Sequence, residues 1–158
     1  MGNIVIKCLD EFYPEDRDIT KLCKYIAGEC PKKEKVRYCK GRGVPSEPEK
    51  AANRMIQIQK HYGKATQRRI YHYIVSFPEE TDDVNGVVVA AERVAGNFFE
   101  TNQVYYGVHE DTDDLHIHFA VNAVSYRDGK KWHSSKKEFE ILKDQIRNEV
   151  DEILRSSQ

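Results

Sequence analysis

Three histidines are the residues of this chain whose type and spacing most directly suggest chemistry. His109 precedes a short acidic segment, and His116 and His118 follow it, two residues apart. Neutral imidazole is the commonest metal ligand among side chains, and three histidines that leave coordination positions open are typical of a catalytic rather than a structural metal site. The sequence therefore predicts a divalent-metal centre formed by these three side chains.

The local pattern indicates how the three imidazoles come together. Segments 103–109 and 115–125 are rich in aromatic and β-branched residues, and the short loop between them predicts an antiparallel hairpin. Side chains alternate along a strand, so His116 and His118 share one face. The opposite face is fully apolar and must pack against helices: Leu115, Ile117, Phe119 and Val121. The hairpin should bring His109 beside His116.

Asp111 lies in the loop of this hairpin. It is expected to accept the second ring N–H of one histidine ligand and so fix the tautomer and orientation of that ring, without the sequence indicating which. The competing interpretation of a His-x-His pair is plain surface or a hydrogen-bonded pair, and the third histidine with the adjacent acid favours the metal site. Structural roles are expected for His61, His72 and His133, although His72 could face the same sheet surface.

The remaining segments predict an α+β fold, a palm-like antiparallel sheet of about four or five strands flanked by helices. Further strands are expected at 3–8 and 71–77, and helices after an N-cap at Asp18, from 49 to 62, from 83 to 97, and after a Ser135–Glu138 capping box. The basic stretch up to Pro48 contains glycines and prolines in its second half, and is expected to be a loop. The length fits a single domain over residues 1–158.

Charge and composition limit the partners. The net charge of −1 counts against strong nonspecific nucleic-acid binding. Basic residues still gather in patches that could line a DNA groove, with solvated surface charge as the competing interpretation. The candidates for DNA contact are Lys32, Lys33, Lys35, Arg37, Arg42, Arg68 and Arg69. No apolar run approaches the length of a membrane span, and no secretory signal is apparent, so we expect a cytoplasmic protein with reduced cysteines.

The histidine segment resembles the signature of relaxases, the mobilisation nucleases of conjugative and mobilisable elements. That signature consists of His-x-Asp, then His-x-His and an apolar strand that ends in Asn, matched here by 109–111 and 116–122. Residues 71–78 are similar to the family's second motif, an apolar strand that ends in Ser and then Pro. Lys24-Tyr25-Ile26 resembles the first motif, a tyrosine inside a short N-terminal helix.

This resemblance implies a nuclease that cuts one DNA strand at an origin of transfer. A tyrosine attacks the scissile phosphorus and becomes linked to the 5′ phosphate, while a metal held by the three histidines polarises that phosphate. Tyr25 is then the expected nucleophile, Tyr38 the second choice, and Asp111 the orienter or base. Mn²⁺ or Mg²⁺ is the expected ion, and Zn²⁺, Ni²⁺ or Co²⁺ also suit three nitrogen donors. Expected partners are single-stranded DNA, accessory proteins of a relaxosome and a coupling protein.

Alternative functions stay open at this point. A rolling-circle replication initiator endonuclease belongs to the same histidine-tyrosine class, but its tyrosine usually follows the histidine motif. A non-enzymatic DNA-binding accessory protein would not be expected to keep the histidines together with Tyr25. A structural metal module would unfold on chelation. Relaxases are usually longer and more basic, so this chain is either a compact member or the nuclease domain of a longer protein.

Overall fold

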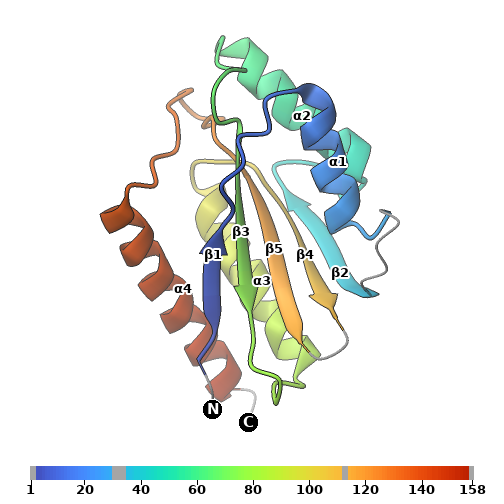
Figure 1. Cartoon of the computed structure of the whole chain (residues 1–158), viewed down its shortest axis with the longest axis vertical. Coiled ribbons are helices and arrows are strands. Elements are labelled where there is room, and N and C mark those ends of the chain that lie inside the picture. Colours follow the sequence, from blue (N-terminus) through green and yellow to red (C-terminus); the bar gives the residue numbers. More distant parts are fainter. Residues whose placement is uncertain (1–2, 30–34, 112–113, 157–158) are drawn as a thin grey trace.

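The computed structural model describes residues 3–29, 35–111 and 114–156, which form an antiparallel sheet with helices on both faces (Figure 1). Within these ranges the sheet has five strands, in the order β1-β3-β5-β4-β2, and each neighbouring pair is antiparallel. The strands are β1 (Val5–Cys8), β2 (Lys35–Arg42), β3 (Ile70–Ser76), β4 (Val104–Glu110) and β5 (Leu115–Asn122). The helices are α1 (Asp16–Ile26), α2 (Pro48–His61), α3 (Val84–Phe99) and α4 (Lys136–Ser156). The predicted α+β class and strand number are confirmed.

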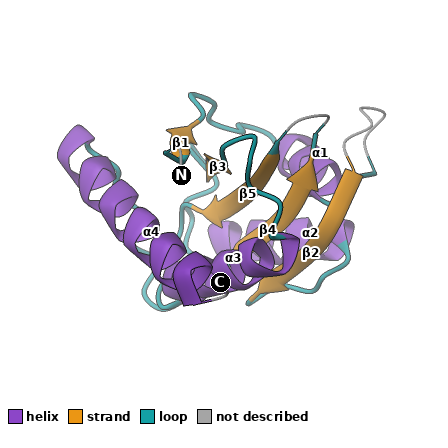
Figure 2. Cartoon of the chain, turned by 90° about the horizontal axis from the view of Figure 1, so that it is seen from below, coloured by secondary structure: helices purple, strands orange, loops and turns teal. Residues whose placement is uncertain are grey.

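The two pairs of helices cover opposite faces of the sheet (Figures 1 and 2). Residues of α3 and α4 pack on one face in a core that includes Ile117 and Phe119 of β5. Residues of α1 and α2 pack on the other face around Tyr105 of β4 and Ala120 of β5. The alternation predicted for β5 is therefore confirmed. No helix in the described ranges is long and apolar enough to cross a membrane.

The helices begin and end close to the predicted positions, with two corrections. Asp18 is the third residue of α1 rather than its N-cap, and its carboxylate accepts a hydrogen bond of 3.0 Å from the backbone N–H of Glu15, which precedes the helix. The spacing predicts a buried stripe of Ala51, Met55, Ile58 and Tyr62 on α2. Ala51 and Met55 are buried, but Ala52, Ile56 and Gln59 complete the buried side in place of Ile58 and Tyr62. The predicted capping box of α4 is present, because Ser135 and Glu138 exchange bonds of 2.9 and 3.1 Å.

The main correction concerns the basic stretch for which the sequence predicts a loop. Residues Lys35–Arg42 form β2, which pairs with β4 at the edge of the sheet. An edge strand hydrogen-bonds on one side only and tolerates charged residues, so its lysines and arginines are compatible with a strand. The ladder is interrupted by an irregularity between Val36 and Tyr38, and the sharp turn at Gly43, with a φ of 76°, comes only after the strand ends.

Candidate active site

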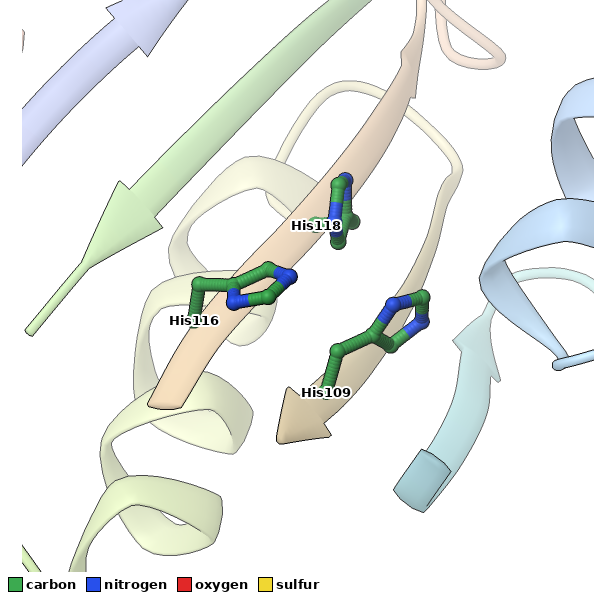
Figure 3. Close-up of side chains that lie close together, drawn as sticks. All are labelled: His109, His116 and His118. Carbon is green, nitrogen blue, oxygen red and sulfur yellow. The ribbon is translucent and has the colours of Figure 1, made fainter. Parts of the chain in front are cut away.

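The β4–β5 hairpin gathers the three predicted metal ligands on one face. His109 on β4 lies directly opposite His116 on β5, and His118 follows two residues later on the same face. Figure 3 shows all three rings on the same side of the hairpin. One ligand atom from each ring lies within 4.8 Å of the others, and all three residues are buried. The structure thus brings together the set that the sequence predicted.

The hydrogen bonds of two of these rings suit metal binding. His109 Nε2 lies 2.8 Å from the carbonyl oxygen of Ile26, and since a carbonyl only accepts, Nε2 carries the proton and Nδ1 keeps its lone pair. His118 Nε2 is buried and has no hydrogen-bond partner. A buried nitrogen without a partner costs free energy, which a bound cation would offset. The donor set therefore fits a divalent transition-metal ion.

A fourth histidine enters the site from β3. His72 Nε2 lies 2.8 Å from His118 Nδ1, and the Tyr13 hydroxyl lies 3.1 Å from His72 Nδ1. Burial, with a smaller contribution from His109, lowers the pKa of His72 to about 4. Burial also lowers the pKa of His118, and the neighbouring histidines add to the effect. Both rings are therefore neutral near pH 7, which is the form that binds metal ions.

Tyr25 lies over the histidine cluster, as the resemblance implied. It occupies the last turn of α1, and its ring centroid is 5.5 Å from that of His109 and 5.2 Å from that of His118. The helix approaches β4 closely because residue 107 is glycine. A Cβ built there would lie 2.8 Å from the carbonyl oxygen of Ile26. Tyr38, the second candidate for the nucleophile, lies on the opposite face of the sheet, where its hydroxyl donates to Glu92 of α3. This position excludes Tyr38 as the nucleophile.

A cleft of about 630 Å³ adjoins Tyr25 and His72. Its other walls are formed by α1 and by the connection between β1 and α1, and they are largely apolar. Phe12 lines this cleft and is 53% exposed. The guanidinium of Arg68 stacks over the Phe12 ring at 5.2 Å. A partly exposed aromatic ring beside a cation is the kind of surface on which nucleic-acid bases stack.

The predicted DNA-contacting residues do not form one patch. Arg69 is only 2% exposed and donates to Gln59, to the carbonyl of Pro14 and to Asp16, so it has a structural role instead. Arg42 lies against Phe99 of α3, on the face away from the histidines.

Of the other basic candidates for DNA contact, three lie near the site and two lie outside the described residues. Lys35 is exposed, and Arg37 forms an ion pair of 2.7 Å with Glu110 at the end of the strand that carries His109. Arg68 lies beside the cleft. Lys32 and Lys33 lie outside the described residues.

Asp111 follows β4 at an exposed position, and its backbone N–H donates to the carbonyl of Asp114 at 2.9 Å. The Ile26 carbonyl already takes the proton of His109, and His72 contacts the second nitrogen of His118. The ring whose second N–H Asp111 would accept is therefore that of His116, and this role of Asp111 stays a prediction.

Asn122, the last residue of the histidine motif, has a structural role that the sequence did not indicate. Its side-chain amide donates to the Met55 carbonyl at 3.2 Å and to Gln103 at 2.9 Å, and its oxygen accepts from Gln59 at 3.0 Å. It also accepts from the backbone N–H of Val124 at 3.0 Å. Because the amide uses all its bonding positions, it joins the end of β5 to α2 and to Gln103, the residue that precedes β4.

Fold, histidine cluster and overlying tyrosine agree with a single class of protein. The chain belongs to the relaxase family, since the family model described as the MobA/VirD2-like nuclease domain matches residues 25–153. The resemblance deduced from the motifs is thereby confirmed.

Individual relatives are similar over part of their length. The chain is 30% identical over 110 residues to protein TraI of Escherichia coli, covering 68% of this chain and 15% of TraI. It is 29% identical over 107 residues to protein rlx of Staphylococcus aureus, covering 64% of this chain and 32% of rlx. A solved structure described as "Molecular Basis of Vancomycin Resistance Transfer in Staphylococcus aureus" shares the fold, with a TM-score of 0.71 at 10% identity, over 99% of this chain and 94% of that one.

Proposed function

We propose that this chain is a metal-dependent, site-specific single-strand DNA endonuclease and strand transferase that nicks an origin of transfer through a 5′-phosphotyrosyl intermediate. The observation that carries the proposal is the position of Tyr25, whose ring lies 5.2 Å from His118 and 5.5 Å from His109. The candidate nucleophile thus lies directly beside the three histidines that could hold a metal ion. The chain corresponds to 15% and 32% of the two relatives, so any role in complete DNA transfer is part of the proposal.

The chemistry proposed for Tyr25 is a transesterification. Its hydroxyl oxygen attacks the scissile phosphorus, and the new O–P bond forms as the bond from phosphorus to the 3′ oxygen breaks. The phenol proton passes to a base, for which Asp111 is the candidate, and the departing 3′ oxygen takes up a proton to become a free hydroxyl. A free tyrosine has a pKa of about 10, so its ionisation at pH 7 costs about 4 kcal/mol, which the site must offset.

The histidines provide the electrophilic side of the site. His109 through Nδ1 and His118 through Nε2, together with His116, would hold a divalent ion, with Mn²⁺ or Mg²⁺ as the proposed ion in the cell. When bound, such an ion supplies Lewis-acid stabilisation of charge on the phosphate. The buried, unpartnered Nε2 of His118 supports this role.

Single-stranded DNA is the proposed substrate because the phosphate must reach a buried site. The cleft beside Tyr25 has room for an unpaired nucleotide, and Phe12 with Arg68 offers a surface for base stacking. Lys35 and Arg37 are proposed to contact the phosphate backbone at the edge of the sheet, and Lys32 and Lys33 are proposed as further phosphate contacts. The net charge of −1 leaves the chain without an excess of positive charge to neutralise DNA phosphates. Accessory relaxosome proteins and a coupling protein are therefore proposed to contribute to tight DNA binding.

The test uses labelled single-stranded oligonucleotides tiled across the DNA that adjoins the gene, incubated with the protein and Mn²⁺. Cleavage should give a shortened product with a free 3′-OH and a protein–DNA adduct that mass spectrometry maps to Tyr25. Tyr25→Phe should abolish the adduct. Tyr38→Phe, the matched control on the opposite face, should retain it. An adduct in Tyr25→Phe, or metal-independent cleavage, would contradict the proposal.

A further inference from the structure

A chain of hydrogen bonds leads away from the histidine cluster through His72 and Tyr13. His118 Nδ1 lies 2.8 Å from His72 Nε2, and His72 Nδ1 lies 3.1 Å from the Tyr13 hydroxyl. The three residues come from β5, β3 and the connection between β1 and α1, and all are 6% exposed or less. Water is therefore a poor substitute for any of these bonds.

The direction of donation along this series of hydrogen bonds is fixed at His118. A neutral imidazole has a proton on one nitrogen and a lone pair on the other. His118 Nε2 faces the cluster and has no hydrogen-bond partner, so it can serve as a ligand only if the proton is on Nδ1. That Nδ1–H then donates to His72 Nε2, and the proton of His72 lies on Nδ1 and donates to the Tyr13 oxygen.

The opposite direction is less favourable for physical reasons. It would place the His118 proton on Nε2, where it would have no acceptor and would point toward two other imidazoles. A buried N–H without an acceptor costs about 1–3 kcal/mol. At the far end the Tyr13 oxygen can accept this bond, because its own proton has the nearby Glu11 carboxylate as an acceptor, and both burial and Glu11 raise the pKa of Tyr13.

The backbone is adapted to present Tyr13 at this position. Tyr13 has a positive φ of 55°, which is uncommon for residues other than glycine. The loop is attached to β3 by the backbone N–H of Leu9, which donates to the carbonyl of His72 at 2.9 Å. Conformational strain of this kind persists only where surrounding contacts hold it.

We propose that His72 is a positioning residue for the metal site, holding His118 in the tautomer and orientation that bind the ion, with Tyr13 orienting His72 in turn. The inference rests on the proposed metal site and adds the residues that hold one of its ligands in place. Such outer partners typically contribute about 10–100-fold to metal affinity. His72 itself stays outside the ligand set, because its two nitrogens are both in hydrogen bonds.

The first experiment measures Mn²⁺ affinity of the full chain by calorimetry. His72→Leu removes the acceptor and should weaken binding about 10–100-fold, whereas His72→Gln keeps an oxygen acceptor in reach of His118 and should recover most of it. Tyr13→Phe should give a smaller loss in the same direction. His61→Leu, a histidine exchange on the exposed end of α2, is the control and should not change the dissociation constant. Folding of each variant is checked by thermal melting.

The second experiment separates this inference from the proposed function. Long-range ¹⁵N–¹H NMR spectra of the metal-free chain show which nitrogen of His118 carries the proton. The expected result is Nδ1 in the wild type, with loss of that preference in His72→Leu. A proton on Nε2 in the wild type, or an unchanged Mn²⁺ affinity in folded His72→Leu, would overturn the positioning role. Absence of Mn²⁺ binding with the proton on Nδ1 would instead overturn the metal site and leave the hydrogen-bond assignment standing.

Discussion

The two faces of β5 differ in what covers them. The side chains of Ile117 and Phe119 point toward α3 and α4 and are fully enclosed by apolar neighbours. On the other face, the apolar core beneath α1 and α2 includes Ala120 but does not include the histidines. His118 lies beyond it, beside Tyr25 in the last turn of α1, and His116 lies two residues earlier on the same face.

Within one strand, one face therefore contributes mainly to the stability of the fold, and the other carries the histidines proposed to act in catalysis. The α3–α4 face stabilises the fold by burying hydrocarbon, whereas the histidine face buries polar rings whose desolvation opposes folding. Alternation allows both without conflict, since neighbouring residues never share a face. Substitutions on the two faces should therefore have distinct consequences for stability and for nicking.

The largest effect is expected from His118→Ala. Loss of a metal ligand should reduce Mn²⁺-dependent nicking by about 10³-fold or more, because a Lewis-acid ion contributes several kcal/mol and about 1.36 kcal/mol equals a factor of ten in rate. The free energy of unfolding should fall by no more than about 1–3 kcal/mol, from the bond lost by His72. Oligonucleotide cleavage and urea unfolding measure the two quantities. Wild-type cleavage by the folded variant would contradict the assignment.

Phe119→Ala tests the opposite face. The Phe119 ring is fully buried between Phe98 and Tyr106, with ring centroids 5.6 and 6.0 Å away. Its removal should lower the free energy of unfolding by about 3–5 kcal/mol. The Mn²⁺ dissociation constant, measured below the unfolding transition, should stay close to that of the wild type. A large loss of affinity in the folded variant would show that the two faces are coupled.

Asn122→Ala should have an intermediate effect. The substitution leaves hydrogen-bonding groups of Met55, Gln59 and Gln103 without their partner, which should cost about 1–3 kcal/mol of stability. Because Asn122 supports the hairpin and α2 rather than the reacting groups, nicking by the folded variant should persist. Nicking reduced as strongly as in His118→Ala would give Asn122 a place in the site instead.

The smallest effect concerns pH and the start of α1. The Arg69 guanidinium, and then Lys60, lower the pKa of Asp16 by hydrogen bonding to its carboxylate. A carboxyl group with a lowered pKa stabilises the fold above its unfolded pKa of about 3.9, and that contribution is lost as pH falls through the folded value. In acid unfolding, Asp16→Asn should be less stable than the wild type at pH 7, and the difference should shrink below about pH 4. A constant difference would contradict this explanation.

Much of this arrangement follows from local patterns. Alternation in 115–122 was sufficient to assign the two faces of β5, and the short loop before it predicted the pairing of His109 with His116. The capping box at Ser135 is equally local. These features depend on residues close together in the chain, for which periodicity and capping chemistry are informative.

Features that depend on distant residues could not be predicted in the same way. The charged residues and the glycine of β2 predict a loop when the sequence is considered alone. The segment is nevertheless a strand, because it pairs with β4, about seventy positions later in the chain. Tyr13 could not be connected with His72, because 59 residues separate them and only the sheet order brings the loop to β3. Arg69 resembles a surface cation in the sequence, although its partners, Asp16 and Gln59, lie on two different helices.

Gly107 has a consequence for the whole site. Even one methyl group at this position would press against the Ile26 carbonyl, which both ends α1 and orients His109. Gly107→Ala would therefore tilt the helix end outward, detach that carbonyl from the ring and carry the phenol of Tyr25 away from the cluster. The position of Tyr25 relative to the three histidines therefore depends on the absence of a Cβ atom at residue 107.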